Sequence, residues 1–221
     1  MADNFDVVVV GAGVVGCSVA YYLAMEGIKV ALLEREAIGS GSSAHATGFI
    51  SLLGTEFTPG PSFSFGLESY NEFPSLVQEL EEATGMDLLY QRRPSLRLAL
   101  EESEEVLIKD LMTWQKEHVA MHWITAAEVH ELEPRLTPSL LGAVYEDESA
   151  QLDSYRLNLA LAAGAERKGA ETILRQVTGL MSEGDRITGV RTTGGDISCG
   201  TVVIAAGLWS PPFQRDLDFP V

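Results

Sequence analysis

The chain of 221 residues is 46% hydrophobic and 21% charged, so it can bury a substantial core as one large domain or two small ones. Its 32 acidic residues outnumber 15 basic ones, and the net charge of −17 argues against nucleic acid or an anionic membrane as a partner. The sequence has no apolar run near the roughly eighteen residues that a membrane span needs, and no basic signal-peptide region, so we expect a cytoplasmic protein without a transmembrane segment.

The first 36 residues predict a strand, a glycine-rich turn, a helix and a second strand. Residues 5–10 form an apolar, β-branched run, typical of a parallel strand that is covered on both faces. Residues 11–16 make the turn, and apolar side chains at helical spacing follow as far as Gly27, which favours the end of a helix. The second strand is expected at residues 29–33, which completes a βαβ unit.

The turn carries the G-x-G-x-x-G spacing in Gly11, Gly13 and Gly16. The first glycine permits the tight turn, the second lets a pyrophosphate approach the backbone, and the third lets the helix pack closely on the sheet. Glu34 follows 23 positions after Gly11, where a carboxylate can accept hydrogen bonds from both ribose hydroxyls and disfavours the 2′-phosphate of NADP. The pattern therefore predicts a dinucleotide site for NAD or FAD.

Beyond this unit the α/β pattern continues. The Gly- and Ser-rich residues 37–49 favour a loop folded around the ligand, because exposed backbone amides bind phosphates. Helices are expected at 68–84, at 101–118 and from Asp153 or Ser154 onward, and strands at 86–90, 95–100, 142–145, 171–175, 177–181, 186–192, 196–199 and 201–210. We expect a discontinuous nucleotide-binding domain, 1–84 with 149–221, and an insert at 85–148.

Three stretches occur in the order found in a known family: GSGSSAHATGFIS behind the βαβ unit, LDSYRLNLALAAGAERKGAE in the middle and VVIAAGLWS near the end. Together with the glycine turn they resemble the D-amino-acid oxidase superfamily of FAD-dependent oxidoreductases. The resemblance implies an α/β fold, with a Rossmann-like FAD-binding domain and a partial α+β substrate domain inserted into it. It corresponds to the N-terminal portion of members similar to glycine and sarcosine oxidases.

The resemblance also implies which residues contact FAD. The three glycines and Glu34 would hold the pyrophosphate and the adenosine ribose, with Arg35 near the adenosine and Val177 at the adenine edge. Ser42 and Ser43 would contact the pyrophosphate. The positions implied along the ribityl chain and the flavin ring are His45, Ala46, Thr47, Gly48, Ala205, Ala206 and Gly207.

His45 lies in SSAHATG, which is similar to a pattern in dimethylglycine- and sarcosine-type dehydrogenases. The histidine of that pattern is bonded covalently to the 8α-methyl carbon of the flavin; the alternative is an ordinary polar residue near the cofactor. The other histidines, His118, His122 and His130, have no clustered acidic or thiol partner in the sequence, so we expect no metal site. No catalytic residue is predicted.

These features predict an enzyme, an FAD-dependent oxidase or dehydrogenase that oxidises a small amine, amino acid or 2-hydroxy acid by hydride transfer to the flavin. Members of the family continue beyond the point that matches the final residues. We therefore expect an N-terminal fragment whose missing C-terminal half, or a second chain, completes the active site, so that this chain alone need not be active. Two alternatives remain open: an NAD-binding Rossmann dehydrogenase and a nucleotide-binding subunit of a split, multi-chain oxidoreductase.

Overall fold

The structure, a computed structural model, describes residues 4–52 and 58–216. These residues form two compact units, each assembled from separate stretches of the chain. The first unit takes its residues from Met1–Thr47, Glu79–Leu88 and Asp153–Val221, and the second takes them from Gly48–Gln78 and Leu89–Leu152. The division into functional domains that the sequence suggests, 1–84 with 149–221 and 85–148, stays a prediction.

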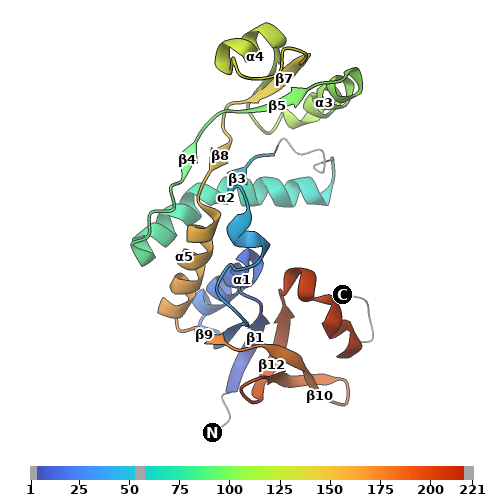
Figure 1. Cartoon of the computed structure of the whole chain (residues 1–221). Helices are drawn as coiled ribbons and strands as arrows, with labels where there is room; N and C mark the ends of the chain where they lie inside the picture. Colours follow the sequence, from blue (N-terminus) through green and yellow to red (C-terminus); the bar gives the residue numbers. More distant parts are fainter. Residues whose placement is uncertain (1–3, 53–57, 217–221) are drawn as a thin grey trace. The chain divides into compact units, whose positions relative to one another are not determined.

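A six-stranded sheet forms the centre of the first unit (Figure 1). Its strands lie in the order β10 (Val177–Glu183), β11 (Arg186–Thr192), β12 (Ile197–Ile204), β1 (Asn4–Val10), β2 (Val30–Glu34) and β9 (Glu171–Leu174). The four strands from β12 to β9 run parallel, whereas β10, β11 and β12 pair antiparallel. Because β1 lies between β12 and β2, the residues that follow β1 meet the ends of both neighbours.

The apolar run of β1 explains its central position. Val8 and Val9 are completely buried although their side chains point to opposite faces, and Leu32 and Leu33 of β2 are buried in the same way. Both faces of a parallel sheet are covered in this class of fold, so such strands have few polar positions. The α/β class predicted from the sequence is confirmed.

Two helices of the first unit, α1 (Val14–Met25) and α5 (Ser154–Arg167), pack against each other (Figure 1). Gly164 of α5 allows the close approach, because a Cβ at this position would lie 2.8 Å from the ring of Tyr21. The Tyr21 hydroxyl in turn donates a 2.5 Å hydrogen bond to the carboxylate of Glu79. These contacts hold the C-terminal half of α1 in place.

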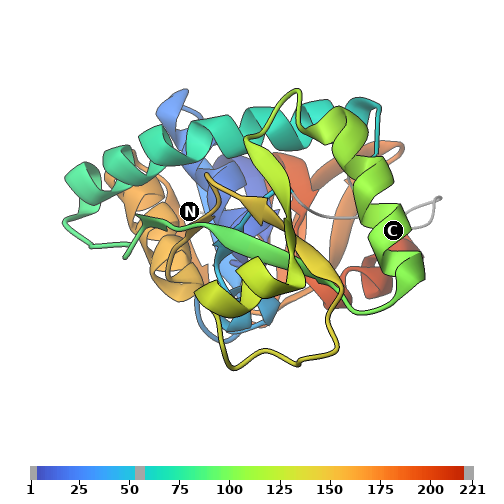
Figure 2. The ribbon, with the colours of Figure 1, turned by 90° about the horizontal axis from the view of Figure 1, so that it is seen from above.

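The second unit contains two small antiparallel sheets. One consists of β3 (Phe49–Ile50), β8 (Ala150–Gln151) and β4 (Gln91–Arg92), and the other of β5 (Ser95–Ala99), β7 (Gly142–Glu146) and β6 (Met121–Thr125). The larger of these sheets is accompanied by α3 (Glu102–Gln115) and α4 (Ala126–Leu132), as Figure 2 shows. Buried Ile108 of α3 packs with Val144 of β7 in a small core.

Helix α2 (Pro61–Thr84) contributes residues to both units and begins earlier than the sequence predicts, at Pro61 rather than Glu68. Pro74 lies inside the helix, and neither in its first turn nor at its end. The strand predicted at 86–90 is wrong, because no strand forms there and the next one, β4, begins at Gln91. The physical reason is local: Gly85 and Leu89 both have positive φ angles, 73° and 55°, which extended strands do not contain.

Two strands predicted at 196–199 and 201–210 are instead the single strand β12, which ends at Ile204. Its register with β1 continues from Asn4 opposite Ser198 to Val10 opposite Ile204, so the parallel ladder carries the strand through Gly200. The chain then leaves the sheet and forms the short 3-10 helices η2 (Gly207–Trp209) and η3 (Pro211–Asp216). None of the helices formed by residues 4–52 and 58–216 has the length and apolar character of a membrane span.

Candidate cofactor site

The glycine turn brings three backbone segments into direct contact. Gly11 adopts a φ of 103°, and a Cβ added there would lie 2.6 Å from the carbonyl oxygen of Ala205. At Gly16 a Cβ would lie 1.8 Å from the carbonyl oxygen of Gly11. A side chain fits at neither position. The two glycines therefore let the start of α1 pack onto the ends of β1 and β12.

The start of α1 presents backbone N–H groups that the helix itself does not satisfy. Its N-cap is Gly13, which has no side chain to cap the helix. The amide of Val14 donates instead to the hydroxyl oxygen of Ser43, over 2.9 Å, and this serine belongs to the 3-10 helix η1 (Ser42–His45). Backbone donors and the positive end of the helix dipole make such a turn suitable for a phosphate group.

The carboxylate of Glu34 lies at the end of β2 beside this turn. One of its oxygens accepts a hydrogen bond from the amide of Ala12, over 2.9 Å, and the other accepts bonds from the amides of Arg35 and Glu36, over 2.8 and 3.0 Å. These bonds fix the direction of the carboxylate. Each carboxylate oxygen has two acceptor sites, so the oxygen that is bonded to Ala12 can still accept one hydrogen bond from a ligand.

A cavity of about 670 Å³ lies within the first unit, over the carboxyl ends of its parallel strands. Its size falls in the range of small-molecule and cofactor sites. Ten of the residues predicted to contact the cofactor line it: Gly11, Gly13, Glu34, Arg35, Ser42, Ser43, Val177, Ala205, Ala206 and Gly207. Residues that are far apart in the sequence are thus brought to one site.

Five predicted residues lie outside this lining: Gly16, His45, Ala46, Thr47 and Gly48. Gly16 acts through the packing of α1 described above. The exposed ring of His45 forms a 3.0 Å hydrogen bond, through Nδ1, with the carbonyl oxygen of Gly41. Gly48 belongs to the second unit, in which its carbonyl oxygen accepts a bond from the amide of Leu152. The cofactor contacts of all fifteen residues stay a proposal.

Several residues of the lining were not predicted from the sequence, among them Arg175 and Gln176; Trp209, expected there as a packing residue, also lines the cavity. The Arg35 guanidinium lies 4.2 Å from the centroid of the Trp209 ring, and this cation–π contact joins the end of β2 to η2. Arg175 follows β9 directly. Its place in the cavity lining could have been predicted, because the carboxyl ends of neighbouring parallel strands meet at one edge of a sheet.

Cys17 lies in α1 close to the site but is unsuited to reactions with a ligand. Its side chain is fully buried, and its thiol donates to the carbonyl oxygen of Ala12 over 3.4 Å. Burial raises the pKa of the Cys17 thiol to about 12, and the Glu34 carboxylate adds to that shift. The thiol therefore stays protonated at neutral pH, and a protonated thiol is a poor nucleophile.

The donor set fits a dinucleotide such as FAD. The helix start at Gly13 and Val14 lines the cavity and offers N–H donors to a pyrophosphate, and the fixed Glu34 carboxylate keeps an acceptor site for a ribose hydroxyl. Among the described residues, no group of three or more His, Cys, Asp or Glu side chains is arranged to hold a metal ion.

Comparison with known proteins identifies relatives of this chain. A family model described as FAD dependent oxidoreductase (DAO) matches residues 6–221. Glycine oxidase from Geobacillus kaustophilus is 33% identical over 214 residues, which cover 95% of this chain and 56% of the relative. Mitochondrial dimethylglycine dehydrogenase from Mus musculus is 34% identical over 227 residues, covering 99% of this chain and 25% of the relative.

Solved structures agree with these matches. The crystal structure of glycine oxidase from Geobacillus kaustophilus superposes with a TM-score of 0.90 at 32% identity, covering 99% of this chain and 60% of that protein. Glycine oxidase from Bacillus cereus gives a TM-score of 0.86 at 35% identity, with 96% and 58% covered. The chain thus spans little more than half the length of these glycine oxidases. It belongs to the FAD-dependent oxidoreductase family.

Proposed function

We propose that this chain is the FAD-binding portion of an oxidoreductase that oxidises a small amine or amino acid, with a 2-hydroxy acid as the alternative substrate class. The observation that carries the proposal is the cavity in which the glycine turn, the Glu34 carboxylate and the end of β12 meet. The family is FAD-dependent, which favours FAD over the NAD alternative.

In this proposal Gly11 and Gly13 accommodate the pyrophosphate, Glu34 accepts a hydrogen bond from the adenosine ribose, and the 205–207 segment lies close to the flavin. The small residues at 205–207 leave room for a flat ring beside the backbone. Bound FAD supplies a two-electron acceptor, which no amino-acid side chain provides. The protein's own contribution is to hold and orient the cofactor. No catalytic residue is assigned.

The substrate class rests on the similar proteins. They include glycine oxidase, dimethylglycine dehydrogenase and, at 33% identity, 4-methylaminobutanoate oxidase from Paenarthrobacter nicotinovorans. All three names refer to amino acids or methylated amines. A shared amine carrying a carboxylate is the simplest common substrate class, and it is the one we propose.

The proposal is tested by the visible absorption spectrum of the purified chain after addition of FAD and removal of the unbound cofactor. Retained bands near about 370 and 450 nm, a property of the flavin itself, are expected. A chain that retains NAD but no FAD under the same conditions contradicts the proposal. A chain that retains neither also contradicts the claim that these residues are sufficient to bind the cofactor.

The expectation that further chain completes the active site stays a prediction. It is tested by sizing the protein from its native source: a single longer polypeptide supports a fragment, and a stoichiometric second chain supports a split enzyme. The cytoplasmic location also stays a prediction, since the similar proteins include mitochondrial ones.

A further inference from the structure

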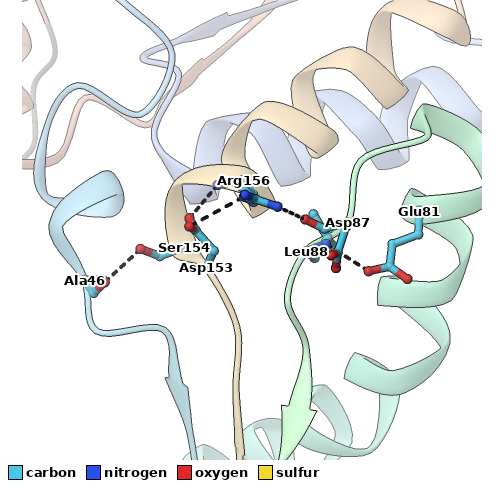
Figure 3. A network of polar contacts seen from close by, with 7 residues as sticks. All are labelled: Ala46, Glu81, Asp87, Leu88, Asp153, Ser154 and Arg156. Atoms are coloured by element: carbon cyan, nitrogen blue, oxygen red, sulfur yellow. Dashed lines mark hydrogen bonds and ion pairs between the residues drawn. The ribbon is translucent and has the colours of Figure 1, made fainter.

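A network of polar contacts fixes the first turn of α5 (Figure 3). Asp153 caps the helix, because its side chain accepts a 2.9 Å hydrogen bond from the amide of Arg156. The Arg156 guanidinium donates to the carbonyl oxygen of Asp87 over 2.8 Å, and the amide of Asp153 donates to the carbonyl oxygen of Leu88 over 2.9 Å. The turn is therefore attached to the segment that follows α2.

That segment is itself held in place. The amide of Leu88 donates a 2.9 Å hydrogen bond to the carboxylate of Glu81 on α2, and Leu88 is completely buried (Figure 3). Bonds to an ionised carboxylate are stronger than those between neutral groups. The first turn of α5 thus has a fixed support within the first unit, independent of the loop that it contacts on its other side.

On that other side lies the 37–47 segment, which we call the cofactor loop because it carries Ser42 and Ser43. The hydroxyl of Ser154 donates a 2.8 Å hydrogen bond to the carbonyl oxygen of Ala46, as Figure 3 shows. Gly39 of the loop lies against α5 as well, since a Cβ there would be 3.3 Å from Asn158 and 3.5 Å from Tyr155.

The other attachment of the cofactor loop is the glycine turn. The amide of Gly39 donates to the carbonyl oxygen of Ala12 over 2.8 Å, and the hydroxyl of Ser43 accepts the 2.9 Å bond from the amide of Val14. The stretch between Ser43 and Ala46 is therefore held at both ends, by α1 on one side and by Ser154 on the other.

We propose that Ser154 is a positioning residue for the cofactor: by holding the carbonyl of Ala46 it keeps the cofactor loop in the conformation that binds FAD. The inference rests on the proposed FAD-binding function. Ser154 lies 108 residues from Ala46 in the sequence and outside the cavity lining, and it acts through the loop without touching the cofactor.

The test compares Ser154→Ala with Ser154→Thr in the full chain. The alanine variant removes the hydroxyl, and the threonine variant keeps it. A matched control is Ser75→Ala on α2, which removes a comparable 2.9 Å bond from a serine hydroxyl to a backbone carbonyl, that of Glu72. Two quantities are measured: hydrogen–deuterium exchange of the amides of residues 41–47 in the cofactor-free protein, and the Kd for FAD.

In Ser154→Ala we expect faster exchange in residues 41–47 and a Kd for FAD that is roughly threefold to tenfold higher, the effect of one lost hydrogen bond. Ser154→Thr restores both values, and Ser75→Ala changes neither. The thermal midpoint of cofactor-free Ser154→Ala stays close to that of the wild type, which separates positioning from general loss of structure.

Unchanged exchange of residues 41–47 in Ser154→Ala overturns the inference, and so does a raised Kd that the threonine variant fails to restore. The exchange measurement needs no cofactor. If the wild-type chain fails to bind FAD, the proposed function fails, and the exchange of the loop still decides whether Ser154 positions it.

Discussion

Gly16 shows how strongly a single position constrains the site, because a Cβ there would lie 1.8 Å from the carbonyl oxygen of Gly11. We predict that Gly16→Ala pushes α1 away from the sheet, lowers the free energy of unfolding by about 1–3 kcal/mol and weakens FAD binding. Urea unfolding and FAD titration measure the two effects. Gly200→Ala is the control, since its nearest neighbour would be 3.7 Å away. Equal free energies of unfolding and equal Kd values for FAD in the two variants would show that Gly16 is not needed for the packing of α1.

Glu34 is the second residue on which the proposed FAD site rests. Its carboxylate accepts three backbone hydrogen bonds, and Glu34→Gln replaces one charged oxygen with an amide that cannot accept. Because hydrogen bonds to charged groups contribute about 1.5–3 kcal/mol, we expect the Kd for FAD to rise roughly tenfold or more. Glu171→Gln on the neighbouring strand β9 is the control and is expected to bind FAD normally. If Glu34→Gln bound FAD with the Kd of the wild type, the carboxylate of Glu34 would not contribute to FAD binding.

His45 is the residue at which the proposed FAD would be bonded covalently, if at all. Its Nδ1 is engaged with the carbonyl oxygen of Gly41, and its ring lies outside the cavity lining. We therefore predict noncovalent FAD: acid precipitation of the loaded protein leaves the yellow colour in the supernatant. Colour retained in the pellet, and lost in His45→Ala, would show the covalent bond found in the similar SSAHATG-type pattern.

At the scale of elements, β7 ends in a buried carboxylate. Glu146 is completely buried, and its second oxygen accepts hydrogen bonds from the hydroxyls of Ser51 and Ser95, over 2.5 and 3.3 Å. Burial raises the pKa of Glu146 above its usual value of 4.5; the neighbouring Glu148 raises it further, and the hydrogen bonds oppose the shift. The carboxyl group therefore binds its proton more tightly in the folded chain than in the unfolded one.

The sign of the pH effect follows from this difference. A group whose pKa is raised by folding stabilises the protein fully below its unfolded value, and the stabilisation is lost as the pH rises through the folded value. We predict that the free energy of unfolding falls from pH 5 to pH 8 and that Glu146→Gln, which cannot ionise, falls less. Urea unfolding at the two pH values measures the slopes. Identical slopes would show that Glu146 does not cause the pH dependence.

Elements with strong local signals were predictable. The βαβ unit is confirmed because an unbroken apolar run, a glycine turn and a helical repeat all agree. Helix α4 was missed although Thr125 and Glu128 form a capping box, a signal that the sequence does carry. The start of α2 was missed for a different reason: Pro61 is compatible with the first turn of a helix, but Pro74 made the longer helix less plausible.

At the scale of the whole molecule, the segments of the site were predictable and several of its contacts were not. Gly11, Glu34 and Ala205 follow from motifs, whereas Arg175 and the bond between Ser154 and Ala46 depend on tertiary packing over long sequence separations. Such contacts cannot be predicted from the residue types in a short stretch of sequence. The sheet order brings the ends of β1, β2, β9 and β12 together, and only that arrangement makes their neighbours one site.

A calorimetric titration of the purified chain with FAD and, separately, with NAD shows directly which dinucleotide the cavity binds. We expect one FAD bound per chain and far weaker binding of NAD, because the glycine turn, Glu34 and the 205–207 segment line one cavity in a chain of an FAD-dependent family. Tighter binding of NAD than of FAD would contradict that expectation.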